Sequence, residues 1–224
     1  YEDSPVWVKK NFDIMYNEHD KGEGGKYKPP AFDEERNLWT SLPAGRSKAK
    51  NRMGCFGAHT NALQYIVDNK IDNVAILEDD AQIDREQMGI RAGETFDTSG
   101  FPQDAPTLLG ATFRHPKSWG KDNQWRKETL PKLIPKFQKG INPLNYDEMR
   151  WSQAHAIYYP THQVAGQLLD KIKQIGASNK KKLGAGPYKH YDLFLGENRL
   201  VPYFHYPSLF THNDGIDEYR NPKA

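Results

Sequence analysis

The feature that most constrains the fold is a short apolar run that ends in three carboxylates. Val74–Leu77 contains four apolar residues in succession, and Glu78, Asp79 and Asp80 follow directly. A continuous apolar run bounded by polar residues is typical of a strand buried on both faces, as in a parallel sheet covered by helices. The sequence therefore predicts a buried strand with an acidic group at its carboxyl end.

Three partly buried carboxylates repel one another and lose hydration, which costs on the order of several kcal/mol unless something compensates. A divalent metal ion is the simplest compensation. Alternation along the strand places Glu78 and Asp80 on one face and Asp79 on the other. Ligands of open α/β sheets also bind beyond the carboxyl ends of the strands. Oxygen ligands favour Mg²⁺ or Mn²⁺, and a nearby imidazole favours Mn²⁺. The alternative is a solvated surface turn.

Hydrophobic periodicity predicts further strands and helices on both sides of this run. An α/β class with a mostly parallel sheet follows from the alternation of helices and strands, and the length of 224 residues fits a single domain, 1–224. The predicted elements are strands over 12–16, 107–113 and 154–159, and helices over 55–68 and about 161–175.

Several segments are predicted to lack regular structure. Residues 17–25 contain turn-forming residues, and residues 26–50 are expected to be irregular. Residues 176–187 predict an exposed loop, either a lid or a solvated lysine face. Loops over 114–150 contain aromatic residues, of which Trp119 and Trp125 either stack on acceptor sugars or pack in the core.

Composition excludes some classes of partner. The chain is 37% hydrophobic and contains no run of about 18 apolar residues, so we expect no transmembrane segment. A formal net charge of +2 lacks the concentrated positive field of nucleic-acid binders, so nucleic acid is not an expected partner. A single cysteine, Cys55, allows no internal disulfide framework and fits a reducing compartment. We expect a cytoplasmic protein, with attachment to the periphery of a membrane as the alternative.

Two segments around the acidic strand resemble glycosyltransferase family 25, which includes lipooligosaccharide and collagen galactosyltransferases. They are Met53-Gly-Cys-Phe-Gly-Ala-His59 and Val74-Ala-Ile-Leu-Glu-Asp-Asp-Ala81, with Ala58 where the family has Ser. Weaker likenesses occur at 107–110, 154–158, 191–194 and 207–210. The resemblance implies a GT-A nucleotide-sugar fold and transfer with inversion, through a metal bound at Glu78, Asp79 and Asp80.

Residues 1–50 lack the opening strand and the arginine of this family. Since the chain opens at Tyr1 rather than Met, a strand upstream of residue 1 is one explanation. A divergent viral or bacterial branch of the family is another.

Individual residues take candidate roles in this chemistry. Asp80 is the first-choice metal ligand, and Glu78 or Asp79 binds the ion through water or contacts the donor. His212 is either a further ligand or a surface histidine. Asp192 is the candidate base that removes the acceptor proton, since a carboxylate at a helix N-terminus is oriented by backbone donors. The alternate base is Glu197, and the alternative role of Asp192 is a helix N-cap.

Other residues are weaker candidates for donor binding. Asn51 and Arg52 precede a predicted helix start and would meet a diphosphate there, with Lys48 and Lys50 as weaker versions. His59 lies on the apolar stripe of its helix, which favours a core histidine, and only the family resemblance makes it a donor contact. Cys55 and His59 share a helix face but lack the third group that a thiol nucleophile requires. The glycines at 22, 24 and 25 lack the spacing of a phosphate-binding loop.

The function predicted from these patterns is a metal-dependent glycosyltransferase. It would move a hexose from a nucleotide diphosphate sugar, with UDP as the expected nucleotide, to a hydroxyl of a glycan, glycolipid or glycoprotein. A nucleotidyltransferase is the first alternative, because it also places acids beyond a buried strand. A non-catalytic domain that binds carbohydrate or nucleotide sugar is the second.

Overall fold

A computed structural model describes residues 32–33, 38–39, 44–89, 94–117, 121–178 and 191–212. The side chains of residues 32–54, 86, 176–178 and 211–212 lie outside this description. The chain divides into two compact units, residues 1–65 with 169–194 and residues 66–168 with 195–224, and each is described by itself. The single domain over 1–224 stays a prediction.

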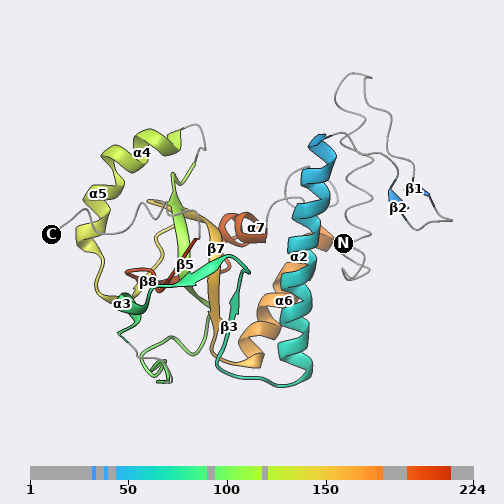
Figure 1. Ribbon diagram of the computed structural model, residues 1–224, viewed down its shortest axis with the longest axis horizontal. Coiled ribbons are helices and arrows are strands. Elements are labelled where there is room, and N and C mark those ends of the chain that lie inside the picture. Colours follow the sequence, from blue (N-terminus) through green and yellow to red (C-terminus); the bar gives the residue numbers. More distant parts are fainter. Residues whose placement is uncertain are drawn as a thin grey trace. The chain divides into compact units, whose positions relative to one another are not determined.

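The described part of the chain contains both helices and strands, in groups of one to three along the sequence (Figure 1). The helices are α2 (Ala44–Asp68), α3 (Arg85–Met88), α4 (Asp122–Glu128), α5 (Leu130–Leu133), the 3-10 helix η2 (Ile134–Lys136), α6 (His162–Ser178) and α7 (Tyr191–Glu197). The strands are β1 (Phe32–Asp33), β2 (Leu38–Trp39), β3 (Val74–Leu77), β4 (Ala81–Ile83), β5 (Thr107–Arg114), β6 (Gly140–Pro143), β7 (Arg150–Tyr159), β8 (Tyr203–Tyr206) and β9 (Phe210–His212).

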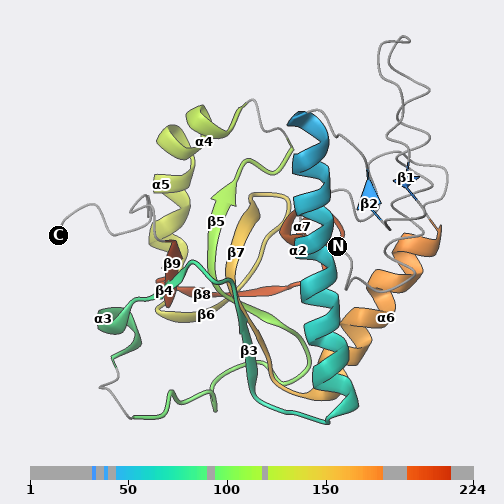
Figure 2. The same cartoon turned by 45° about the vertical axis from the view of Figure 1, so that its right-hand side comes forward.

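The second unit is built on a five-stranded sheet with the order β3-β7-β5-β8-β6. Strands β5 and β8 are parallel, and the other three neighbouring pairs are antiparallel. Figure 2 shows β5 beside β7 in this sheet. The predicted α/β class is confirmed in its coarse form, but the prediction of a mostly parallel sheet is wrong. Strand β7 runs antiparallel to both of its neighbours, and a buried apolar strand has the same sequence pattern in either direction.

Strand β3 has the predicted bounds but not the predicted burial. It lies at one end of the strand order, and its residues alternate between half-buried and exposed. Leu77 is 46% exposed. The expectation of burial on both faces is therefore wrong. Four apolar residues at the end of a sheet can bury only the face that packs on the core.

Strands β5 and β7 and helix α6 confirm three of the predicted elements, with small extensions at their ends. Helix α2 ends at the predicted Asp68 but begins at Ala44, so the expectation that residues 26–50 are irregular is wrong for 44–50. Part of 114–150 is also regular, because α4, α5, η2 and β6 lie there. Trp125 of α4 and Trp151 of β7 are buried, which is the packing role and not sugar stacking.

One hydrophobic cluster of the second unit packs one face of the sheet against the segment that follows β8. Its buried members are Phe101, Leu109, Ala156, Tyr158, Leu209 and Phe210. The Leu209 backbone N–H donates to the Leu109 carbonyl at 2.7 Å, so β9 passes close over β5. Gly110 permits this approach, since a Cβ there would lie 2.3 Å from the carbonyl oxygen of Phe210.

Aromatic rings pack together in the core of the first unit. Phe56 of α2 meets Tyr191 and Phe194 of α7 edge to face, with ring centroids 5.5 and 5.3 Å apart. His59 stacks on Tyr191 at 4.3 Å and is buried. Lys173 of α6 donates to Gln64 of α2 at 3.4 Å.

Some predicted features lie outside the described residues, namely the strand over 12–16, the glycines at 22, 24 and 25, and Trp119. Of the predicted loop over 176–187, residues 176–178 belong to α6 and the rest lies outside. In the part of the chain that is described, none of the helices has the length and apolar content needed to cross a membrane.

Candidate metal centre

The acidic group directly continues the pairing of β3 with β7. Leu77 pairs with Ala156 in this antiparallel ladder. One residue further, the Glu78 backbone N–H donates to the His155 carbonyl at 3.0 Å. Glu78 and His155 are therefore cross-strand neighbours, and such neighbours lie close enough for their side chains to interact.

A tight turn then positions Asp79 and Asp80. The Ala81 N–H donates to the Glu78 carbonyl at 3.1 Å, which closes a four-residue turn over the two aspartates. Strand β4 begins at Ala81 and pairs antiparallel with β9, with Ala81 opposite His212. The Asp84 N–H also donates to the Leu209 carbonyl at 2.9 Å. The turn is thus held at both of its ends by backbone hydrogen bonds.

Strand β7 bulges where it carries His155. Gly110 of β5 pairs with Ala156, whereas Thr112, two residues on, pairs with Ser152, so β7 covers the same step with four residues. Gln153 within this bulge has a φ of 54°, which is unusual for a residue other than glycine. Bulges redirect side chains and are common beside functional sites. This one sets the course of the backbone at His155.

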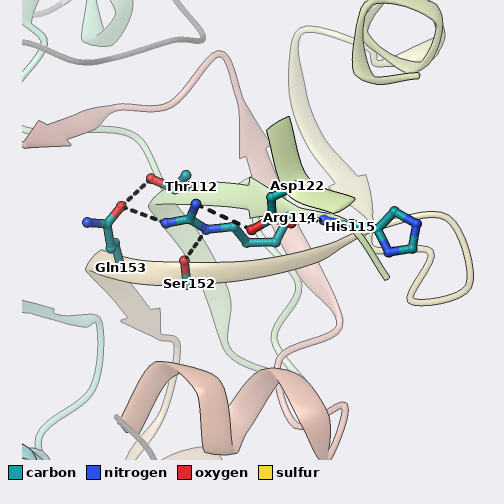
Figure 3. A network of polar contacts seen from close by, with 6 residues as sticks. All are labelled: Thr112, Arg114, His115, Asp122, Ser152 and Gln153. Carbon is teal, nitrogen blue, oxygen red and sulfur yellow. Dashed lines mark hydrogen bonds and ion pairs between the residues drawn. The ribbon is translucent and has the colours of Figure 1, made fainter. Parts of the chain in front are cut away.

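A polar network pins the start of the bulge to the end of β5 (Figure 3). Arg114 Nε donates to Ser152 Oγ at 2.7 Å, and Thr112 Oγ1 donates to Gln153 Oε1 at 2.8 Å. Arg114 also lies 3.5 Å from the buried Asp122 carboxylate, which accepts the His115 backbone N–H at 2.8 Å. The two residues that open the bulge, Ser152 and Gln153, are therefore fixed by side chains of β5.

The resulting arrangement brings three ligand types together. Oxygen atoms of Glu78 and Asp80 and a ring nitrogen of His155 all lie within 4.8 Å of one another. The His155 Nδ1 is 3.9 Å from Glu78 Oε2, and the side chains are 3% and 28% exposed. Two ligands about 2.2 Å from one ion are at most about 4.4 Å apart, so a small side-chain adjustment makes this group a possible metal-binding site.

The convergence of Glu78 and Asp80 has a different cause from the one predicted. Strand alternation was expected to place both on one face, but β3 ends at Leu77 and the turn brings Asp80 back toward Glu78. Asp79 is exposed at the tip of the turn and is not a member of the ligand group.

The candidate bases lie at opposite ends of one short helix. Asp192 stands in the first turn of α7, is buried, and accepts the Leu193 backbone N–H at 2.7 Å. A backbone donor thus orients its carboxylate as expected. It follows Tyr191 inside the helix, so it is not the N-cap. Glu197 is the exposed last residue of α7. The catalytic roles of both residues stay predictions.

The prediction that Asn51 and Arg52 precede the start of a helix is wrong. Both lie inside α2, which begins at Ala44, so they do not precede a helix start, and Lys48 and Lys50 share this position. The side chains of these four residues lie outside the description, as does that of His212. Stacking on Tyr191 is the core role expected of His59.

His155 is the member of the group that sequence reasoning missed. Its segment, Ala154–Tyr159, was predicted as a strand, and a histidine is less often fully buried than the apolar residues of such a strand. That signal could have identified it. Its meeting with Glu78 depends on the pairing of β3 with β7, which brings together residues far apart in the sequence.

Comparisons with protein-family models, with curated proteins and with solved structures find no match to this chain.

Proposed function

We propose that this chain is a metal-dependent glycosyltransferase that transfers a hexose from a nucleotide diphosphate sugar to a hydroxyl group of a glycan or glycoconjugate. The observation that carries the proposal is the meeting of Glu78, Asp80 and His155 at the carboxyl end of β3. Two carboxylates and an imidazole are a donor set suited to a divalent cation. The resemblance of residues 53–59 and 74–81 to glycosyltransferase family 25 supports the choice of reaction.

A divalent cation held by Glu78 and Asp80 would stabilise the negative charge that develops on the departing diphosphate. In the proposed transfer, the acceptor oxygen forms a bond to the anomeric carbon while the bond from that carbon to the diphosphate breaks. The acceptor proton passes to a base, for which Asp192 is the first candidate and Glu197 the second. Since the backbone N–H of Leu193 fixes one Asp192 oxygen, the other oxygen has a defined direction.

The first test is a donor screen with product analysis. The protein is incubated with UDP-sugars and other nucleotide sugars, with Mn²⁺ and a panel of hydroxyl acceptors. Release of the nucleoside diphosphate supports glycosyl transfer, whereas release of pyrophosphate would instead identify a nucleotidyltransferase. Donor binding without turnover under any metal would indicate a non-catalytic binding domain.

Variants then separate binding from chemistry. Asp80→Ala is expected to abolish metal-dependent donor binding, because it removes a ligand. Asp192→Ala is expected to keep donor binding and lose turnover by about 10²-fold or more, as for loss of a general base. Asp104→Ala is the matched control, since Asp104 is an exposed aspartate of the same unit outside the ligand group. Full activity in Asp80→Ala would contradict the proposal.

A further inference from the structure

We propose that His155 is a nitrogen ligand of the cation bound by Glu78 and Asp80, and that it makes the site prefer transition metals such as Mn²⁺ and Co²⁺ to Mg²⁺ and Ca²⁺. The inference deepens the proposed function, on which it rests for the use of the acidic turn. It assigns the His155 imidazole as a direct ligand and adds a metal preference.

The burial of His155 is the first step. Its side chain is 3% exposed within a strand of the central sheet, yet a ring nitrogen reaches the two carboxylates of the turn. A buried histidine needs a polar partner for its ring nitrogens. The carboxylates of Glu78 and Asp80 repel each other at this short distance. A divalent cation among the three groups neutralises both carboxylates and uses the nitrogen as a ligand.

The spacing is the second step. At 3.9 Å, the Glu78 oxygen and His155 Nδ1 are beyond the 2.7–3.2 Å range of a hydrogen bond between nitrogen and oxygen. The same separation is within the range spanned by two ligands of a single ion. The two side chains form an ion pair at this distance, and bonds from both atoms to one metal ion would fit the same separation.

The rigidity of the histidine is the third step. The backbone at His155 is fixed on the β3 side by its carbonyl, which accepts the Glu78 N–H. On the β5 side the bulge is pinned through Ser152 and Gln153 by Arg114 and Thr112 (Figure 3). Glu78 is half-buried and can adjust its side chain toward an ion, whereas His155 cannot move far. A fixed imidazole favours ions that accept nitrogen ligands, which Mg²⁺ and Ca²⁺ do poorly.

The experiment measures metal affinity directly, without a donor or turnover. Isothermal titration of the whole chain with MnCl₂, CoCl₂, MgCl₂ and CaCl₂ is expected to give at least about tenfold tighter binding of Mn²⁺ and Co²⁺ than of Mg²⁺. In His155→Gln this preference is expected to disappear, while weak binding of Mg²⁺ to the carboxylates remains. In NMR spectra of the Co²⁺-loaded protein, hyperfine-shifted imidazole signals should be present in the wild type and absent in His155→Gln.

The matched control is His205→Gln, because His205 is a partly buried histidine of the same sheet and does not belong to the ligand group. It should keep the Mn²⁺ preference and the shifted signals. Glu78→Gln keeps His155 and should lower the affinity for every cation tested. It therefore tests the site even if His155→Gln does not fold. An unchanged Mn²⁺ affinity in either site variant overturns the inference. Failure of the proposed function has a different signature, which is metal binding as described without release of nucleoside diphosphate from any donor.

Discussion

Strand β3 has a carboxylate–histidine pair at each end, and the two pairs differ in spacing and burial. Before the strand, Asp72 Oδ1 lies 2.8 Å from His162 Nδ1, with side chains that are 50% and 23% exposed. After the strand, Glu78 lies 3.9 Å from the deeply buried His155. Asp72 and His162 are within hydrogen-bonding distance and are called the closed pair. Glu78 and His155 are farther apart, with Asp80 as a third group, and are called the open pair.

The closed pair lies where the chain enters β3, in a group of hydrogen bonds between side chains and backbone. Asp72 also accepts the backbone N–H of His162, the first residue of α6, so it caps that helix. Next to it, Asn73 accepts the Tyr158 hydroxyl at 2.8 Å, and its N–H donates to the Pro160 carbonyl. The same residue types thus form a structural clip at one end and a possible ligand group at the other. Distance and burial distinguish them, not composition.

The largest effect is expected from a substitution at Gly110, where the backbone of Phe210 comes close to β5. In Gly110→Ala the new Cβ meets the Phe210 backbone, which cannot move aside as a side chain could. We expect a loss of roughly 3 kcal/mol in the free energy of unfolding, the upper end for overpacking. Because Gly110 pairs with Ala156, next to His155, Mn²⁺ binding should weaken as well. Urea denaturation and Mn²⁺ titration check the two effects.

Gly100→Ala is the control for this substitution. Gly100 lies in an exposed turn, and a Cβ there meets nothing within 4 Å. It should leave both stability and Mn²⁺ binding near the wild-type values. Equal losses in the two variants would show that the close approach of β9 to β5 does not matter for the open pair.

The next effect distinguishes the two pairs by metal. At a Mn²⁺ concentration 100 times the Kd, we expect the free energy of unfolding to rise by about 2.7 kcal/mol. This rise should disappear in Glu78→Gln and persist in His162→Gln, since Glu78 belongs to the ligand group and His162 does not. Thermal melts with and without Mn²⁺ provide the measurement. A rise that His162→Gln abolishes would contradict the distinction between the pairs.

The sequence predicted those elements whose pattern is local. Strands β5 and β7 were found because they contain apolar runs, and helix α6 because its apolar residues recur at helical spacing. The first part of α2, Ala44–Gly54, was missed because it is polar and has no apolar stripe. Sheet direction was missed because β7 has the same pattern whether parallel or antiparallel. In the candidate site, Glu78 and Asp80 could be predicted together because they are close in the sequence. His155 could not, because it meets them only through the pairing of β3 with β7 and through the bulge in β7.

A smaller effect concerns acid stability and a histidine outside both pairs. Burial lowers the pKa of His205, whose Nδ1 donates to the Pro207 carbonyl at 2.7 Å. His205 therefore binds a proton more readily in the unfolded chain than in the folded protein. The free energy of unfolding should fall as the pH drops below about 6.5. One such histidine contributes at most about 1.4 kcal/mol per pH unit. Urea denaturation from pH 7.5 to 5.5 measures the slope, which His205→Gln should reduce.

The smallest effect is expected at the closed pair itself. The hydrogen bond from the His162 backbone lowers the pKa of Asp72. The ionised Asp72 therefore contributes to the stability of the fold at neutral pH, and this contribution is lost as the pH falls below about 3.9. Asp72→Asn retains an oxygen for that N–H and removes only the charge, which solvent and salt screen at this exposed site. The melting temperature at neutral pH should therefore change little. If Asp72→Asn instead removed the Mn²⁺ stabilisation as fully as Glu78→Gln, the ion would not be specific to the open pair, and spacing and burial would not determine which carboxylate–histidine pair binds metal.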